Sequence, residues 1–287
     1  MKKILLFAVL AITTTAVFTY LAGSHLIQPQ QHKIDTSEIE GLPYTNVQIP
    51  SKSGSILSGW YIAGDSNKPG VLLMHGVRSD RTEMAKRAKF LHEAGYSVLL
   101  FDFQAHGESK GDSITFGYLE SLDAAAALHF LKQKVANRPV GIIGVSLGGA
   151  SALLGKAAKA CQALVIESVY PTLDQAVADR LRMVLGAWGG YLTPLLTYQL
   201  KPRLGFSASA LRPINHLSQL TCPVFIISGD KDRRTTPEET KAMFTAAHAP
   251  KELWIVKGAG HVDFSKFTPE VYREKVLQFL RENLEKI

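Results

Sequence analysis

The sequence lacks the residue patterns that usually mark a metal centre, a dinucleotide site or a nucleic-acid interface. Its nine histidines form no H-x-H or H-E-x-x-H pattern, so we expect no bound metal. No G-x-G-x-x-G motif follows the first expected strand-to-helix turn, and no cofactor is expected. Although the net charge is +7, lysine and arginine occur singly or in pairs among acidic residues. Nucleic acid is therefore not an expected partner.

Internal repeats and low-complexity tracts are also absent, which argues against a solenoid and against a disordered arm. The chain has 287 residues, of which 46% are hydrophobic, and this is sufficient for one large core. We therefore expect one globular domain over residues 42–287.

The first 23 residues have the composition of a membrane segment. Lys2 and Lys3 precede an uncharged, mostly apolar stretch at residues 4–23, whose length is about that needed to cross a bilayer. We expect a transmembrane signal anchor that holds the protein to the membrane and leaves the domain outside the cytoplasm. The alternative is a signal peptide cleaved near residues 22–24, which would release the domain. Residues 24–41 are polar and are expected to form a tether.

Short apolar runs alternate with helical patterns in the rest of the chain. Two runs around a turn at residues 51–54 indicate an antiparallel hairpin at a sheet edge, with strands at 44–49 and 56–63. Buried strands are expected at 70–74, 97–101, 140–145, 163–166, 224–227 and 253–256, and helices at 81–94, 118–135 and 271–284. This alternation is typical of an α/β protein whose parallel sheet carries helices on both faces.

One turn of this pattern suggests a catalytic serine. Residues 144–148 read G-V-S-L-G and lie between an apolar strand and a stretch of small residues that can begin a helix. Such a nucleophile elbow places the serine in a strained conformation, and the positions two before and two after it must be nearly free of side chain. Gly144 and Gly148 meet this requirement around Ser146.

Ligands of open α/β sheets bind at the carboxyl ends of the strands. Those ends carry chemically active side chains in this sequence: His75, Asp102, Ser146, Glu167, Asp232 and His261. The candidate chemistry is therefore expected at a single edge of the sheet.

Taken together, these residues resemble the α/β-hydrolase superfamily over residues 44–284. The resemblance rests on motifs in this order: His75-Gly76, Asp102-x-x-x-His106-Gly107-x-Ser109, the Ser146 elbow, Gly229-x-x-Asp232 and Gly260-His261. It implies an α/β-hydrolase fold, with a mostly parallel eight-stranded sheet, helices on both faces and a helical lid at about residues 170–213. The anchor and residues 57–61 are similar to those of bacterial serine hydrolases of the cell envelope. That similarity implies an inner-membrane-anchored protein, or a secreted or periplasmic one after signal cleavage.

Three of these residues have the chemistry required of a nucleophile, a base and an acid. Ser146 is a weak nucleophile that requires a base, and His261 lies on the loop after the last strand, where it can reach the elbow. A carboxylate must orient that base, and the family spacing favours Asp232 over Asp230. Glu167 is a third candidate, because some members of the superfamily place the acid after the preceding strand.

The oxyanion formed during attack requires donors that are already in place. The backbone N–H groups of Val77 and Leu147 are the candidates, because one follows His75-Gly76 and the other follows the nucleophile. His75 is expected to brace the oxyanion loop and His106 to have a structural role. Arg78 is expected to be exposed to solvent, the alternative being contact with a substrate carbonyl or phosphate.

The lid region is the most apolar and aromatic stretch outside the anchor. We expect more than half of its large apolar side chains to pack the lid onto the domain, and its inner face to line an acyl pocket. The expected activity is that of a serine hydrolase, carboxylesterase-like or thioesterase-like, which cleaves a small-molecule or lipid-like ester or thioester of a hydrophobic acyl group. The alternatives are an amidase, peptidase or acyltransferase on the same residues, and a non-catalytic binding module.

The two cysteines precede strands that are neighbours in this fold. Cys161 comes before the strand at 163–166 and Cys222 before the strand at 224–227. Both a disulfide and two buried free thiols are compatible with this placement.

Overall fold

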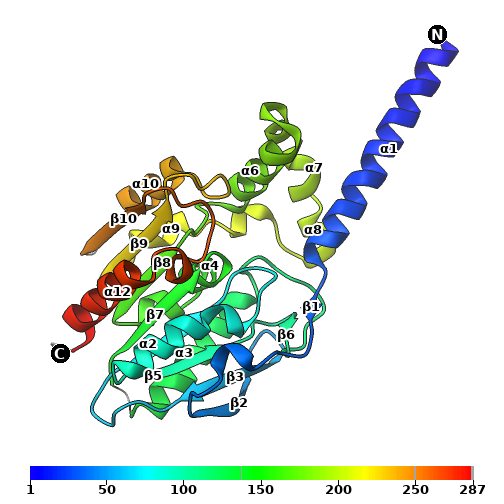
Figure 1. The fold of residues 1–287 in the computed structure, drawn as a ribbon. Helices are drawn as coiled ribbons and strands as arrows, with labels where there is room; N and C mark the ends of the chain where they lie inside the picture. The colour runs from blue at the N-terminus through cyan, green and yellow to red at the C-terminus, as the bar shows by residue number, and fades with distance from the viewer. Residues whose placement is uncertain (137, 249, 286–287) are drawn as a thin grey trace.

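We analysed the chain in a computed structural model that describes residues 1–136, 138–248 and 250–285; the side chains of Ile4, Leu5, Ala8, Ala11 and Ile12 lie outside this description. An eight-stranded sheet forms the centre of the domain (Figure 1), in the order β10-β9-β8-β7-β4-β5-β3-β2. Its strands are β2 (Tyr44–Pro50), β3 (Ile56–Ile62), β4 (Gly70–Met74), β5 (Ser97–Phe101), β7 (Val140–Val145), β8 (Ala163–Glu167), β9 (Val224–Gly229) and β10 (Lys251–Val256).

The predicted sheet is confirmed in both strand content and direction. The hairpin β2–β3 is antiparallel and β3 pairs antiparallel with β5, whereas the five pairings from β5 through β4 to β10 are parallel. The parallel strands β4, β5, β7, β8 and β9 are buried along their whole length. Continuous apolar runs form such strands because helices cover both faces of the sheet.

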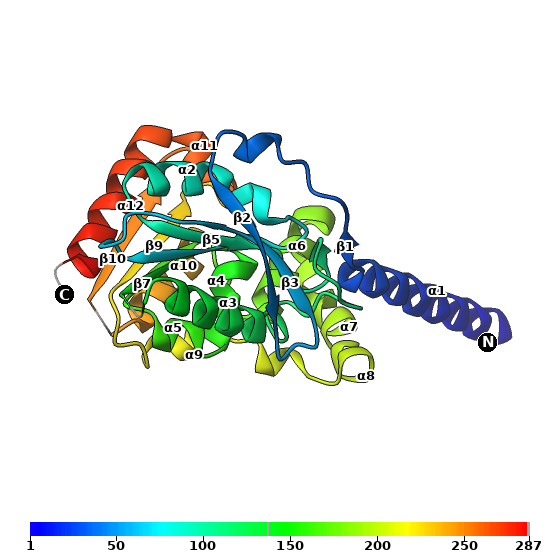
Figure 2. The ribbon, with the colours of Figure 1, turned by 90° about the horizontal axis from the view of Figure 1, so that it is seen from below.

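Helices lie on both sides of the sheet, as Figure 2 shows. One face carries α3 (Glu120–Lys134), α4 (Leu147–Leu154), α5 (Ala157–Ala160), α9 (Ile214–Leu217) and α10 (Pro237–Ala246). The other carries α2 (Ala85–Glu93), α11 (Phe264–Phe267) and α12 (Pro269–Leu284). Leu72 and Leu99 point into the first core and Val71 and Val98 into the second, as the two-residue period of a strand requires.

The segment at residues 24–41, which we expect to be a tether, lies against the domain. Short strands β1 (Gln30–Gln31) and β6 (His106–Gly107) pair in parallel. The 3₁₀ helix η1 (Ser37–Ile39) places Ile39 in the second core, where its side chain is fully buried. These contacts position the end of the N-terminal helix next to the domain.

The N-terminal helix α1 (Lys2–Ile27) extends away from the body of the molecule (Figure 1). Among the described residues, no helix combines the length and the apolar character needed to cross a membrane. This result gives no support to the predicted span at residues 4–23, of which five side chains lie outside the described structure. The membrane span stays a prediction.

The lid between β8 and β9 is helical, as the resemblance implies. It contains α6 (Leu173–Leu185), the 3₁₀ helix η3 (Ala187–Leu192), α7 (Thr193–Thr197), α8 (Leu200–Leu204) and the 3₁₀ helix η4 (Ala208–Ala210). Leu200 and Phe206 pack into a small core of the lid with Leu173. The expectation that large apolar lid residues pack inward fails at residues 183–198, where eight of them are exposed: Met183, Val184, Leu185, Trp188, Tyr191, Leu192, Leu195 and Tyr198.

Both cysteines are free and buried in this structure. The Sγ atoms of Cys161 and Cys222 lie 3.7 Å apart at the start of the neighbouring strands β8 and β9. They are thus close enough to touch and are not bonded.

Candidate active site

Ser146 occupies the strained turn that the sequence pattern predicts. It joins the end of β7 to the start of α4 with φ 47° and ψ −106°, and only 4% of the residue is exposed. A non-glycine residue with such a φ must be held by its surroundings. The backbone N–H of Ser146 donates to the carbonyl of Glu167 at 2.8 Å, and its own carbonyl accepts from Ala150 N–H at 3.0 Å.

The glycines on either side of Ser146 allow strand and helix to approach closely. A Cβ atom on Gly148 would lie 2.3 Å from the carbonyl oxygen of Met74, and one on Gly144 would lie 2.5 Å from the nitrogen of Gly149. Both distances are too short for a real Cβ. The elbow therefore depends on the absence of a side chain at both positions.

His261 and Asp232 lie side by side on neighbouring loops, after β10 and after β9. Nδ1 of His261 is 2.8 Å from Oδ2 of Asp232, whose side chain is fully buried. Burial alone would raise the pKa of Asp232. The hydrogen bond and charge of His261, together with the N–H groups of Arg234 and Thr235, lower that pKa below its ordinary value. A charged carboxylate in this position orients the imidazole and stabilises its protonated form.

The described structure contains no hydrogen bond between Ser146 and His261; the ring of His261 bonds only to Asp232. Such bonds are often long in a site without substrate and tighten when substrate binds. The structure therefore brings His261 and Asp232 together, and the contact of His261 with Ser146 stays a prediction.

The two competing acids make other contacts. Oδ1 of Asp230 accepts from the N–H of Gly258 at 2.7 Å and supports the loop after β10. Glu167 is buried and pairs with Arg87 at 2.6 Å, and it also accepts from the hydroxyl of Tyr272. Neither contacts His261, so among the three candidate acids the geometry favours Asp232.

The loop after β4 lies directly beside Ser146. A Cβ on Gly76 would be 3.8 Å from Cβ of Ser146. The N–H groups of Val77 and Leu147 follow Gly76 and Ser146 respectively, and in the described structure neither donates to a protein acceptor. Both are therefore available to a developing negative charge near Ser146.

Two side chains hold this loop from beneath. Nε2 of His75 accepts from Phe103 N–H at 3.1 Å, so Nδ1 carries the proton and donates to the carbonyl of Gly76 at 2.7 Å. Burial lowers the pKa of His75 to about 4, which keeps the ring neutral in this bracing position. Oε2 of Glu83 accepts from Gly76 N–H at 2.7 Å. Glu83 could not be predicted from the sequence, because no motif connects it to the loop.

Two further residues have surroundings that suit a structural role. Burial also lowers the pKa of His106 to about 4, and its Nδ1 contacts the carbonyl of Gln104 at 2.9 Å. Arg78 is exposed, as expected for a loop arginine, but its guanidinium reaches the last turn of α1, where Nη1 lies 3.2 Å from Nε2 of His25. Neither contact was foreseen from the sequence.

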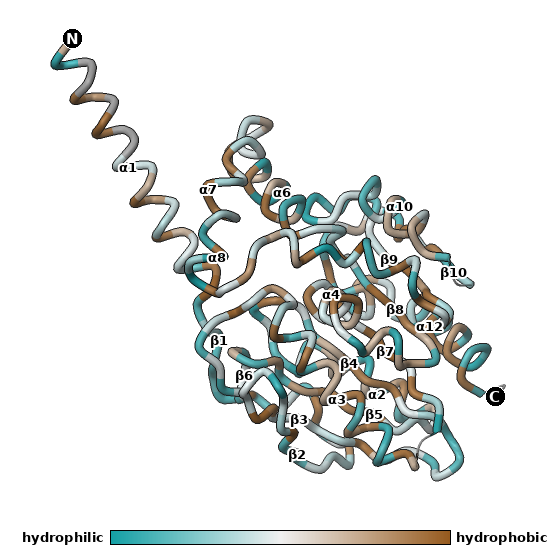
Figure 3. The backbone as a smooth tube through the Cα atoms, turned by 180° about the vertical axis from the view of Figure 1, so that it is seen from behind, coloured by the Kyte–Doolittle hydropathy of each residue, from teal (hydrophilic) through white to brown (hydrophobic). Residues whose placement is uncertain are grey.

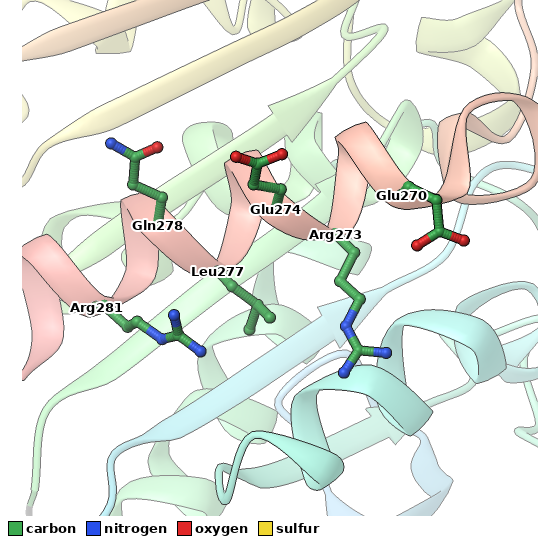
Figure 4. A pocket seen from close by; sticks show the side chains of 6 residues that line it. All are labelled: Glu270, Arg273, Glu274, Leu277, Gln278 and Arg281. Atoms are coloured by element: carbon green, nitrogen blue, oxygen red, sulfur yellow. The ribbon is translucent and has the colours of Figure 1, made fainter.

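Two surface cavities lie away from this site. One, of about 500 Å³, lies along α12, where Arg273 and Arg281 line it with acidic neighbours (Figure 4). The other, of about 840 Å³, lies between α1 and the lid, and its lining includes Tyr20 and Leu195. Neither is lined by Ser146, which is nearly covered by its surroundings.

The sequence of this chain matches a known protein family. A family model described as the alpha/beta hydrolase family matches residues 71–273. The chain belongs to this family. The alpha/beta hydrolase is similar to Bacillus subtilis YqkD, with 26% identity over 98% of this chain and 97% of YqkD. It is also similar to Escherichia coli YfhR, with 25% identity over 82% of this chain and 80% of YfhR.

Solved structures extend the comparison. The Pyrococcus furiosus esterase Pf2001 matches this alpha/beta hydrolase with a TM-score of 0.72 and 28% identity, over 90% of this chain and 99% of the esterase. The family and this neighbour support ester hydrolysis as the general activity of the alpha/beta hydrolase.

Proposed function

We propose that this alpha/beta hydrolase is a serine esterase that forms an acyl-enzyme on Ser146. The observation that carries the proposal is the contact of His261 with buried Asp232, on loops that follow β10 and β9 at the same edge of the sheet as the Ser146 elbow. His261 takes the proton of Ser146 as the hydroxyl attacks an ester carbonyl, and then gives that proton to the leaving alcohol. Water activated by the same histidine releases the acid.

The charge that develops on the carbonyl oxygen is stabilised by the N–H groups of Val77 and Leu147. Their donors are fixed before the reaction, because His75 and Glu83 hold the loop that carries Val77. Preorganised donors of this kind supply much of the rate enhancement in acyl transfer.

The substrate we propose is an ester or thioester with a hydrophobic acyl group, of small-molecule or lipid-like character. Two features support this substrate: the apolar composition of the lid, and the similarity of the chain to the Pyrococcus furiosus esterase Pf2001. A series of aryl esters from acetyl to long acyl groups tests this preference in the full chain. We expect turnover to rise with acyl length, and comparable rates for acetyl and long-chain esters would overturn it.

A fluorophosphonate probe tests the nucleophile directly. We expect the wild-type chain to be labelled and Ser146→Ala to lose all labelling. Ser151→Ala is the matched control, because Ser151 lies on the same helix and its hydroxyl bonds only to the carbonyl of Leu147. Retained labelling in Ser146→Ala, or none in the wild type, would rule out the proposed chemistry and favour a binding module.

We also propose that residues 4–23 attach the protein to the inner membrane of a bacterial cell, uncleaved, with the domain outside the cytoplasm. The basic pair Lys2–Lys3 ahead of an uncharged stretch supports this orientation. The continuation of α1 through Ser24, which accepts a hydrogen bond from Arg203 at 3.0 Å, supports an intact segment. Recovery of the full-length chain in membranes after alkaline carbonate washing is expected; a shortened, extractable chain would favour cleavage.

A further inference from the structure

The tip of the lid exposes an unusual set of aromatic side chains. Trp188 is 79% exposed, Tyr191 77% and Tyr198 80%. The rings of Trp188 and Tyr191 lie 5.7 Å apart, so they form a small aromatic patch. Leu195 and Val184 are exposed nearby on the same segment. Apolar surface of this kind, grouped on one projection, usually marks an interaction site.

Helix α1 exposes a second apolar surface beside the lid. Its large apolar side chains that face solvent include Phe7, Leu10, Phe18 and Leu21. Figure 1 shows α1 and the lid projecting from the same side of the molecule, and Figure 3 shows hydrophobic residues along both α1 and α7. The two surfaces together contain most of the exposed large hydrophobic side chains in the described part of the chain.

Polar contacts join α1 and the lid. Arg203 donates to the carbonyl of Tyr20 at 2.7 Å, and its guanidinium lies 4.1 Å from the centre of the Tyr20 ring. Gln199 donates to the carbonyl of Thr19 at 3.1 Å. The groove of about 840 Å³ lies between these two elements. The apolar surfaces are therefore parts of one face, which we call the α1–lid face.

Basic residues outnumber acidic ones on this face. No aspartate or glutamate occurs at residues 1–34 or 180–213, and the two lid aspartates lie earlier in α6, where Asp179 is buried and pairs with Arg182 at 2.8 Å. Lysine and arginine do occur there, and Lys201 lies exposed at the start of α8. A second copy of this chain would bring the same positive charge to the contact and be repelled. Anionic lipid headgroups would be attracted, by about 1 kcal/mol for each nearby basic residue.

We propose that the α1–lid face binds the surface of an anionic phospholipid bilayer, with Trp188, Tyr191 and Tyr198 at the depth of the headgroups. Tryptophan and tyrosine are enriched at that depth, because one part of the ring system is apolar and the other forms hydrogen bonds. The lid thus adds a membrane contact to any made by α1. This binding does not depend on the ester chemistry of Ser146.

Fluorescence of the full chain tests this binding. Trp60 is 1% exposed and Trp254 lies on the edge strand β10, so Trp188 is the tryptophan on the α1–lid face. The chain, carrying Ser146→Ala to prevent lipid turnover, is mixed with vesicles of phosphatidylcholine and phosphatidylglycerol with brominated acyl chains. We expect a blue shift and strong quenching that Trp188→Phe removes. Quenching equal in wild type and Trp188→Phe would overturn the proposal.

Vesicle flotation separates the lid contribution from that of α1. When the chain is added from solution to preformed vesicles, so that α1 has not been inserted across the bilayer, replacing Trp188, Tyr191 and Tyr198 by serine is expected to weaken partitioning by about tenfold or more. The control replaces two exposed apolar residues that lie away from the face, Val262 and Val271, by serine. Unchanged flotation of the triple variant would mean that α1 binds alone. Shielding of Trp188 that depends on protein concentration without vesicles would identify a second copy as the occupant. Either result rejects the proposal.

Discussion

The imidazole of His261 lies 2.8 Å from a carboxylate oxygen of Asp232, although Glu167 at the end of β8 and Asp230 after β9 lie at the same edge of the sheet. The difference lies in what each acid contacts. Asp230 accepts the N–H of Gly258, and Glu167 is paired with Arg87. Asp232 is buried. Its other oxygen, Oδ1, accepts hydrogen bonds from the backbone N–H groups of Arg234 at 2.8 Å and Thr235 at 3.0 Å. These donors fix the carboxylate and leave Oδ2 for the histidine.

Asp232→Asn should lower kcat by roughly 10³- to 10⁴-fold, because the amide cannot stabilise the protonated imidazole of His261. Ester turnover measured at saturating substrate gives the comparison. Asp230→Asn is the matched control; Glu167→Gln is compared only as protein shown to be folded, because it breaks the buried pair with Arg87, and each should retain kcat within about tenfold. A large loss in either control with full activity in Asp232→Asn would transfer the role to that acid.

Gly148→Ala should destabilise the fold by about 1–3 kcal/mol or more, because the new Cβ would lie 2.3 Å from the backbone oxygen of Met74. Thermal unfolding measures the loss. Gly260→Ala is the control, since a Cβ there meets only the oxygen of Lys231 at 3.8 Å. Equal unfolding temperatures for Gly148→Ala and the wild type would contradict the close packing of the elbow.

Arg87→Met should cost about 3–5 kcal/mol of unfolding free energy, because it leaves the buried charge of Glu167 without its partner. Arg87 itself is fully buried, at the second core. The exposed pair of Arg273 with Glu93 provides the comparison, and Arg273→Met should change stability by about 0–1 kcal/mol. Denaturant titration of both variants makes the test. Similar costs for the two would show that burial does not govern the Arg87 pair.

Glu239→Gln should make the protein more stable than the wild type at alkaline pH. Burial, and then the carboxylates of Asp179 and Asp232, raise the pKa of Glu239 to about 7 against the opposing hydrogen bond from Thr236 N–H. The folded state thus holds the proton more tightly than the unfolded state. The resulting stabilisation is complete below the ordinary pKa of a glutamate and is lost as the pH rises through about 7.

Unfolding temperatures at pH 5 and pH 8 test this dependence. From pH 5 to pH 8, the unfolding temperature of Glu239→Gln should rise relative to that of the wild type. That of Glu238→Gln should not, because Glu238 is exposed. A gain at pH 5 that disappears at pH 8 would have the opposite sign and would refute the assignment.

The sequence by itself determined the sheet and the elbow. Continuous apolar runs of four to six residues predicted the buried strands, because such runs are shorter than a typical buried helix and are bounded by turn residues. The spacing of Gly144, Ser146 and Gly148 predicted the strained turn, because its steric requirement is local in the chain. The order of Ser146, Asp232 and His261 came from the resemblance, and so did the position of the lid.

Contacts between distant residues were decided only by the tertiary structure. Whether Asp230, Asp232 or Glu167 meets His261 depends on loop geometry and on partners such as Arg87, which is 80 positions from Glu167. Glu83 reaches the loop before Val77 from a separate helix, and no local pattern signals it. The outward direction of Trp188 and Tyr198 could not be predicted either. The sequence shows that these side chains are apolar. Whether they are exposed depends on whether another part of the folded chain packs against them.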